Sequence, residues 1–146
     1  MMAKRAITEE ILGAWVFKAD GRRFDESIAI RSRCVADNYR KDLMRPGQRV
    51  VLWVSGPGDG PRPRGIWGLG WITDEARSDP DDGWVTPADI TLLAEGDRVL
   101  ATDLREIPEL ADMEVLKLPQ GSNPSWVTRE QLAAIVRLLP EWPALQ

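Results

Sequence analysis

Two apolar runs separated by a turn-rich loop constrain the fold of this chain more than any other feature. Residues 49–55 and 66–72 each have the length of a strand and are apolar almost throughout. Glycine and proline supply seven of the ten residues between them, 56–65, which excludes regular structure there. The sequence therefore predicts a hairpin whose first strand is central and covered on both faces. Period-two alternation places Trp67, Leu69 and Trp71 on one face of the second strand.

Glycines at 68 and 70 in that second strand predict curvature or a close approach of another backbone. Curved antiparallel hairpins are the units from which small barrels are built. The hairpin thus points toward a barrel-like fold.

Weaker patterns predict the elements on either side of the hairpin. They are a strand over 14–18 closed by Asp20–Gly21, a polar helix over 36–44 ended by Pro46–Gly47, an acidic loop over 74–83, a short helix over 102–110 interrupted by Pro108, a short strand over 115–118, and a helix that Thr128 and Gln131 cap and Pro140 ends. Residues 84–93 fit two structures, because Thr86–Pro87 can begin a helix while residues 89–92 alternate as in a strand.

Composition excludes several classes of protein. The 146 residues include no histidine and a single cysteine, Cys34, so Ser/His/Asp or Cys/His catalysis, the usual zinc sites and a disulfide framework are excluded. The glycines of the 56–65 loop lack the spacing and the lysine of a phosphate-binding loop, and we assign no metal and no cofactor. We expect a polar lead-in over 1–13 and one domain over 14–146.

The expected location is cytoplasmic. No apolar run approaches the length of a membrane span, and the acidic pair Glu9–Glu10 stands where a signal peptide needs apolar residues. We therefore expect no membrane partner.

Charge and tryptophan content point to the first half of the chain. Residues 1–65 carry 13 basic and 8 acidic residues, a net charge of +5, whereas residues 66–146 carry 6 and 15, a net charge of −9. Any phosphate contact is expected from the first half, although uneven charge on a solvated surface is an equally good explanation. Seven tryptophans against two phenylalanines and one tyrosine offer flat faces for stacking on a base, although each one is more readily explained as core.

Several segments, in order, resemble the EVE domain. They are Trp15–Lys18, Val35–Gly47, Val51–Gly56, Gly65–Gly70, Pro108–Met113 and Gln120–Thr128, within a match that runs from about Trp15 to Val136. The resemblance implies an α+β fold of the PUA-like superfamily, a partly open, curved β-barrel with short flanking helices. It assigns residues 89–93 to a strand. It also implies kinship with YTH domains, which read N6-methyladenosine, and with modules that read modified cytosine in DNA.

The resemblance further implies a flipped base in an aromatic-walled pocket beside the end of the first strand. Carried over by position, the expected base-binding residues are Lys18, Asp20, Arg33, Cys34, Asn38, Tyr39, Trp53 and Ser55. Asn38 and Ser55 can each donate and accept hydrogen bonds. Family members often carry a tryptophan where this chain has Arg33, so the guanidinium plane of Arg33, or another indole such as Trp71, is expected to replace that wall.

These expectations lead to a non-catalytic reader of a modified nucleobase in DNA or RNA. Arg22, Arg23, Arg62 and Arg64 are the expected contacts to the nucleic-acid backbone. The alternative is a protein that binds or hydrolyses a nucleoside or another small molecule, as ASCH-related domains do, with Lys18 and Asp20 as acid and base. A protein-interaction domain using the 56–65 loop is the third class.

Overall fold

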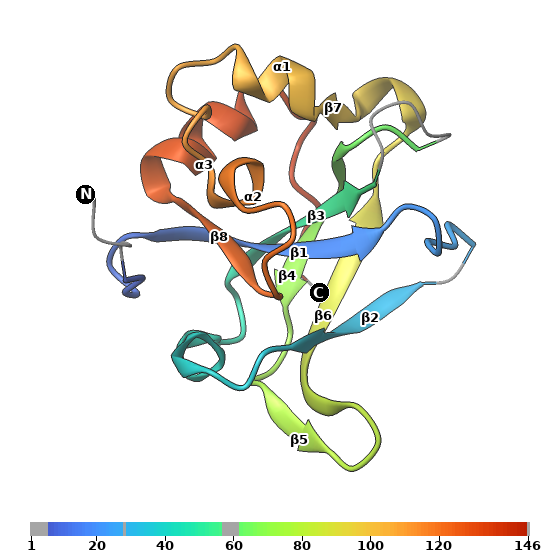
Figure 1. Ribbon diagram of the computed structural model, residues 1–146, viewed down its shortest axis with the longest axis vertical. Helices are drawn as coiled ribbons and strands as arrows, with labels where there is room; N and C mark the ends of the chain where they lie inside the picture. Colours follow the sequence, from blue (N-terminus) through green and yellow to red (C-terminus); the bar gives the residue numbers. More distant parts are fainter. Residues whose placement is uncertain (1–5, 28, 57–61, 146) are drawn as a thin grey trace.

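The computed structural model describes residues 6–27, 29–56 and 62–145 (Figure 1). Its strands are β1 (Leu12–Asp20), β2 (Ile30–Val35), β3 (Arg49–Ser55), β4 (Gly65–Ile72), β5 (Arg77–Asp79), β6 (Gly83–Leu92), β7 (Val99–Leu100) and β8 (Ser125–Thr128). Its helices are the 3-10 turns η1 (Tyr39–Leu43) and η2 (Glu95–Asp97) and the α-helices α1 (Ala101–Arg105), α2 (Glu114–Lys117) and α3 (Arg129–Val136). No helix among the described residues is long and apolar enough to span a membrane.

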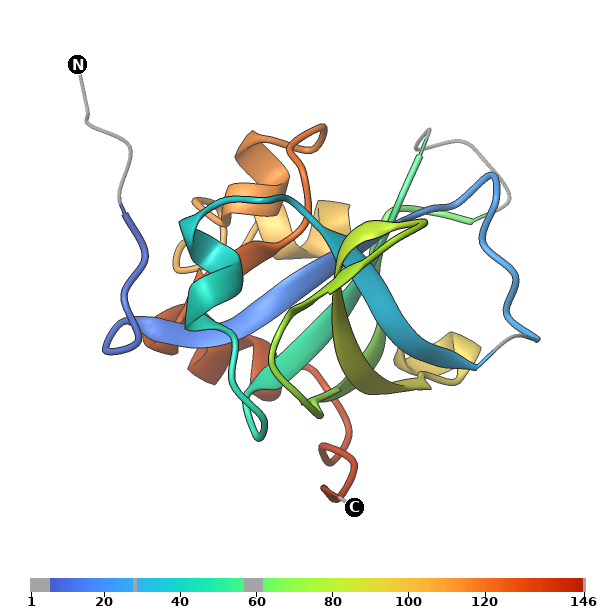
Figure 2. The same cartoon turned by 90° about the horizontal axis from the view of Figure 1, so that it is seen from below.

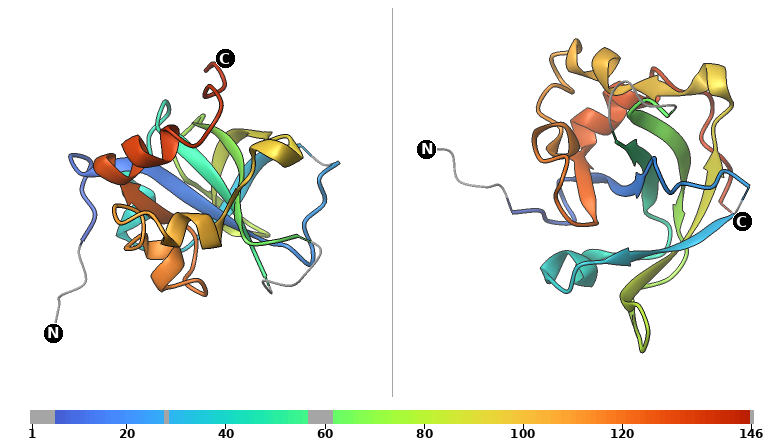
Figure 3. Two further views of the ribbon diagram at one scale, coloured as in Figure 1. Left: turned by 90° about the horizontal axis from the view of Figure 1, so that it is seen from above. Right: turned by 45° about the vertical axis from the view of Figure 1, so that its right-hand side comes forward.

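The strands of the described residues form one curled sheet. Its order is β2-β6-β4-β3-β1-β8, with β5 added to β6 and β7 added to β4. The neighbours pair antiparallel except β1 and β3, which run parallel. Figures 2 and 3 show the sheet curling into a half-open barrel, with the short helices α1, α2 and α3 gathered against one side. This mixed, curled sheet with few short helices confirms the predicted α+β class and the partly open, curved barrel.

β3 is buried on both faces, as its continuous apolar run predicts, and so is β1 beside it. Along β1, Trp15 and Phe17 contribute to the core inside the curl, whereas Ala14 and Val16 contribute to a second core. That second core lies between the sheet and the helices, where it includes Leu104 and Ile135. A strand between two cores needs apolar side chains at every position, not at alternate ones.

A bulge in β4 overturns the predicted division of its faces. Leu52 pairs with Gly68 while the next residue, Trp53, pairs with Ile66, so Trp67 is the extra residue of the pairing. Trp67 consequently lies in the inner core, and Leu69 lies in the core beneath the helices. The prediction that the two share a face was wrong, because period-two alternation does not continue through a bulge.

Two further predictions were wrong. Residues 115–118 are not a strand: they fall mainly in α2, where the backbone amides of Leu116 and Lys117 donate to the carbonyl of Met113. Val115 and Leu116 are adjacent and both buried, which is possible where a short helix packs against a core. Four residues of sequence are too few for their periodicity to distinguish such a helix from a strand. The predicted helix over 36–44 is only the 3-10 turn η1.

The other elements agree more closely with the sequence. Residues 84–93 fall almost wholly in β6, and the predicted acidic loop contains the short strand β5. Thr128 and Gln131 form the capping box, through contacts of 3.0 and 2.9 Å between each backbone amide and the other side chain, although α3 ends at Val136, before Pro140. In the predicted lead-in, Ile7 and Leu12 are buried. The predicted loop over 56–65 includes residues 57–61, which lie outside the described residues.

Candidate functional site

The parallel pairing of β1 and β3 brings two strand ends to one edge of the sheet. Asp20 pairs with Ser55 in the register. Beyond it the amide of Gly21 donates to the carbonyl of Ser55 at 2.7 Å, and the Ser55 hydroxyl donates to the carbonyl of Ala19 at 3.1 Å. A Cβ at Gly21 would lie 2.6 Å from the Ser55 oxygen, so this close approach requires glycine. The polar ends of β1 and β3 are thus fixed against each other.

A pocket of about 450 Å³ opens at these strand ends, and we call it the strand-end pocket. Its lining residues are Lys18, Asp20, Arg22, Ser55, Gly56, Arg64, Pro119, Gln120 and Gly121. Three of the eight residues expected to bind a base, Lys18, Asp20 and Ser55, therefore lie together. Two of the four arginines expected to contact phosphate, Arg22 and Arg64, line the same pocket.

Lys18 is the most constrained charge of the strand-end pocket. It is only 9% exposed, and its ammonium donates to the carbonyls of Gly121 and, at 3.4 Å, Leu118. Burial lowers the pKa of Lys18, an effect that nearby Glu114 opposes and Arg40 adds to. The hydrogen bonds from the Lys18 ammonium to these two carbonyls hold the turn over 118–121 in place, and the turn forms one wall of the pocket.

On the side of β1 that faces away from β3, side chains and not a neighbouring strand bind the backbone of Lys18. Pairing of β1 with β8 stops at Val16 and Ser125. Beyond it the Asn123 amide takes the place of a strand, accepting from the Lys18 N–H at 2.7 Å and donating to the Lys18 carbonyl at 3.1 Å. The guanidinium of Arg33 donates to the same carbonyl at 2.7 Å. These contacts fix the end of β1 where it enters the pocket.

Asp20 and Arg22 form a local pair at the mouth. The Asp20 carboxylate accepts from the Arg22 amide at 3.0 Å and from the Arg22 side chain at 3.3 Å. These hydrogen bonds lower the pKa of Asp20, so it is a carboxylate at neutral pH. Among the described residues, the lining accordingly carries three cations, Lys18, Arg22 and Arg64, against one anion.

Arg33 lies beside the strand-end pocket in a hollow of its own. That hollow of about 320 Å³ shares Asp20 with the strand-end pocket and is also lined by Arg23, Phe24 and Ile30. Burial lowers the pKa of Arg33, and its Nε is buried without a hydrogen-bond partner among the described residues. Arg33 therefore lies beside the end of β1 without lining the strand-end pocket.

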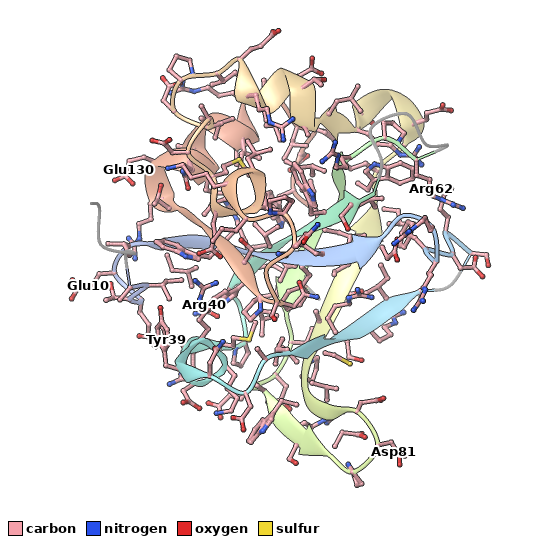
Figure 4. The ribbon with its side chains drawn as sticks, in the orientation of Figure 1. Glu10, Tyr39, Arg40, Arg62, Asp81 and Glu130 are labelled. Carbon is pink, nitrogen blue, oxygen red and sulfur yellow. The ribbon has the colours of Figure 1, made fainter. Side chains whose placement is uncertain are left out.

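Asn38 and Tyr39 line a different pocket, of about 280 Å³, on the other side of the 118–121 turn. Gly121 belongs to both pockets. The Asn38 side chain accepts from the Arg40 amide at 3.0 Å and caps η1, while the Tyr39 hydroxyl accepts from the Ile7 amide at 3.0 Å. Figure 4 shows Tyr39 near η1, on the opposite side of the molecule from Arg62, which lies where β1 ends.

Trp53 and Cys34 line none of these three pockets. Trp53 is 2% exposed, within the core beneath the helices, and its Nε1 has no hydrogen-bond partner among the described residues. The core covers both faces of the indole. Cys34 is exposed on the edge strand β2, next to Arg33 and on the opposite face of the strand.

The sequence analysis did not single out Arg40 and Glu114, which line the pocket of Asn38 and Tyr39. Arg40 and Glu114 form a largely buried ion pair with two contacts of 2.7 Å, and Arg40 also donates to the carbonyl of Pro124 at 2.8 Å. Ser125 donates to the Glu114 carboxylate at 3.0 Å. The signal was present, because residues 120–124 are part of the segment that resembles the EVE domain, but none of them was assigned to the site.

The remaining cations differ in how free they are. Arg62 is bonded to the Gly21 carbonyl at 3.1 Å and to Glu26 at 3.4 Å, and Arg23 lines the hollow of Arg33. The side chain of Arg64 makes no hydrogen bond or ion pair with the residues that the structure describes. Of the four arginines expected to contact phosphate, Arg22 and Arg62 are thus bonded to carboxylates, whereas the side chains of Arg23 and Arg64 have no ion pair with the described residues. Only Arg64 of these last two lines the strand-end pocket.

Comparison with known proteins rests on structure alone. No protein-family model and no curated protein matches the sequence. Among solved structures, Rpa0253 from Rhodopseudomonas palustris is similar with a TM-score of 0.65 and 21% identity, over 87% of this chain and 92% of that one. The DUF55 domain of human thymocyte nuclear protein 1 is similar with a TM-score of 0.62 and 15% identity, over 86% and 97%.

Human THYN1 in complex with DNA containing 5-methylcytosine is also similar, with a TM-score of 0.59 and 16% identity over 89% of this chain and 99% of that one. Identities at this level show the fold alone. The curled, half-open barrel that this chain shares with these structures is the PUA-like fold expected from the sequence.

Proposed function

We propose that this protein is a non-catalytic reader that binds a modified nucleobase of DNA or RNA in the strand-end pocket. The observation that carries the proposal is the pocket itself, in which Lys18, Asp20 and Ser55 meet beneath two arginines at the joined ends of β1 and β3. A modification on a base edge is read only after the base leaves the stack, and a pocket of about 450 Å³ falls in the range of small-ligand sites. The fold shared with human THYN1, solved with 5-methylcytosine DNA, supports the same conclusion.

The lining residues divide the work of recognition. Ser55 and Gln120 present hydroxyl and amide groups that donate and accept, which suits the edge of a base. Arg22 and Arg64 at the rim offer charge to a phosphate and a flat guanidinium to a base. Specificity then comes from the floor of the pocket, and affinity for the backbone comes from its rim.

A titration series tests the proposal. Oligonucleotides of one sequence, each carrying cytosine, adenine or one of their modified forms at a single position, are titrated into the folded protein. We expect at least one modified base to bind tighter than its unmodified parent. Equal binding of the whole panel would refute a reader.

Charge reversal tests the rim separately. Reversing Arg22, Arg23, Arg62 and Arg64 to Glu is expected to weaken binding and to flatten the dependence of log K on log salt by about one per lost phosphate contact. Reversing Asp79, Asp81 and Asp82, at the far tip of the β5–β6 hairpin in Figure 4, is the matched control and is expected to matter little. An unchanged salt slope in the arginine variant would place the backbone contacts elsewhere.

One observation keeps nucleoside hydrolysis as the second candidate: Lys18, with its lowered pKa, and Asp20 share the pocket. Against it, the Lys18 ammonium is held by two carbonyls, and the Asp20 carboxylate is bonded to Arg22. Incubating the protein with modified nucleosides and following product formation by chromatography separates the two. Turnover that is lost in Lys18→Met would favour the enzyme.

A further inference from the structure

The strand-end pocket has no aromatic wall. Its nine lining residues include no tryptophan, tyrosine or phenylalanine, and Pro119 is the one apolar ring among them. Trp53, the indole expected to form a wall, is in the core. Methyl groups are read by apolar contact, as with thymine, or by aromatic cages, as with methylated amines. The lining therefore has no aromatic cage for a methyl group, and Pro119 is the one apolar ring that it offers.

What the pocket offers in place of aromatic rings is positive charge. Lys18, Arg22 and Arg64 face one carboxylate, Asp20, and that carboxylate already accepts two hydrogen bonds from Arg22. Two of the three N–H groups of Lys18 are directed at carbonyls, which leaves one for a ligand. Arg64 has no ion-pair partner among the described residues, so its guanidinium is open to an anion.

Position strengthens the argument for an anion inside the pocket and not only at its rim. Lys18 is 9% exposed, too deep for a backbone phosphate that stays outside, and its ammonium is fixed by the 118–121 turn. Glu114 is a carboxylate near Lys18, yet the cost of burying the ammonium outweighs its effect, and a carboxylate that enters the pocket offsets the remaining cost. Ammonium and guanidinium donors to a carboxylate are among the stronger hydrogen bonds in proteins.

We propose that the modification read by the strand-end pocket is anionic, a carboxylate carried on the base, with Lys18 and Arg64 as its partners. The proposal rests on the proposed reader function and names the class of base that it reads. The base ring stacks against the guanidinium of Arg22 or the ring of Pro119, and Ser55 and Gln120 bind its edge. A methylated base gains no comparable partner in this lining.

The experiment compares four oligonucleotides that differ at one cytosine: unmodified, 5-methyl, 5-hydroxymethyl and 5-carboxyl. Each is titrated into the wild-type protein, Arg64→Gln, Lys18→Met and the control Arg105→Gln, whose exposed side chain on α1 lines none of the pockets above. Wild type and Arg105→Gln are expected to bind the carboxyl form about tenfold tighter than the methyl form. Arg64→Gln and Lys18→Met are expected to lose most of that difference, and Arg64→Gln, which also removes a charge from the rim, is expected to weaken all four forms by a further common factor.

The outcomes distinguish this inference from the reader function. Tighter binding of the methyl form than of the carboxyl form would overturn the anionic class and leave the reader standing. Equal binding of all four forms would overturn the anionic class, and extending that equality to the wider panel of modified bases would remove the reader as well. If Arg64→Gln and Lys18→Met weaken all four forms by one factor, these cations bind phosphate and the inference is wrong. Melting temperatures of the variants, measured in parallel, confirm that each one is folded.

Discussion

The two ends of the parallel pair β1–β3 carry hollows of opposite character. At the starting end a groove of about 820 Å³, the helix-side groove, lies between α3 and the first residues of β1 and β3. It is lined by Glu9, Leu12, Gly13, Gly47, Gln48, Arg49, Trp71, Arg129, Leu132, Ala133, Val136 and Arg137. The strand-end pocket is little more than half that size and has no indole. Size and aromatic content alone would select the helix-side groove as the site.

The cations and indoles at the two ends differ in how fully they are already bonded within the protein. In the helix-side groove, Arg49 stacks on Trp71 at 5.7 Å and on Trp142 at 5.1 Å, and both indole N–H groups bond to backbone carbonyls, which ties the tail of the chain to β4. At the other end, Lys18 shares the nearby carboxylate of Glu114 with Arg40, and the Arg64 side chain has no ion pair with the described residues. A candidate site is therefore better marked by charges that are positioned and incompletely compensated than by volume or aromatic rings.

The largest expected effect separates Trp53, in the core beneath the helices, from Trp71, in the helix-side groove. Trp53→Ala removes a fully buried indole and is expected to lower the free energy of unfolding by about 3 to 5 kcal/mol. Trp71→Ala, at the half-buried wall of the helix-side groove, is expected to cost roughly 1 to 2 kcal/mol and to leave nucleic-acid binding unchanged. Urea unfolding measures both. A Trp53→Ala protein with native stability and reduced base discrimination would show that this indole is a pocket wall after all.

How much of this could be predicted from sequence differs between fold and site. The hairpin of β3 and β4, β1 and the capped helix α3 follow from apolar runs and from Thr128 and Gln131, which are local signals. The edge strand β2 carries exposed Arg31, Ser32 and Cys34, so it has no apolar pattern to detect. The four-residue β8 is defined by its pairing with β1, which is a tertiary contact.

The site was predictable only in part, for a physical reason. Lys18, Asp20 and Ser55 follow strands that the sequence identifies, so their meeting depends only on the parallel pairing of β1 and β3. Residues 118–121 form the opposite wall through backbone carbonyls, whose position no side-chain pattern encodes. Trp53 was expected at the pocket, and the structure places it in the core because β3 has a core on each of its faces.

Removing one cation from each of the two hollows tests which of them binds nucleic acid. Lys18→Met is expected to weaken binding of a recognised oligonucleotide about tenfold, because a positioned charge is lost. Arg129→Met, in the helix-side groove, is expected to change it less than about twofold. Isothermal titration at one salt concentration measures both. The reverse pattern would move the candidate site to the helix-side groove.

Asn38 tests whether the 118–121 turn divides the expected site. Its side chain caps η1 and lies in the pocket beyond that turn, so Asn38→Ala is expected to cost about 1 kcal/mol of stability. Discrimination between modified and unmodified base is expected to stay as in wild type. Competition titrations on the folded variant measure this. Lost discrimination would mean that the turn opens and joins the two pockets when nucleic acid binds.

The smallest expected effect concerns the charge of Lys18 in the free protein. Burial lowers the pKa of Lys18 in the folded state below the ordinary value of 10.5, which the unfolded chain retains. Below the folded-state pKa both states are protonated, and the folded state carries the cost of burying the ammonium. Between the folded-state pKa and 10.5 the folded state releases its proton first, so the unfolded state binds more protons and stability rises with pH relative to a chain without this amine. Lys18→Met is that chain, and subtracting its free energy of unfolding from that of wild type at each alkaline pH isolates the contribution of Lys18. The difference is expected to shift in favour of wild type as pH rises through this window; a shift in the opposite direction would show that the two carbonyls of the 118–121 turn stabilise the ammonium by more than burial costs it.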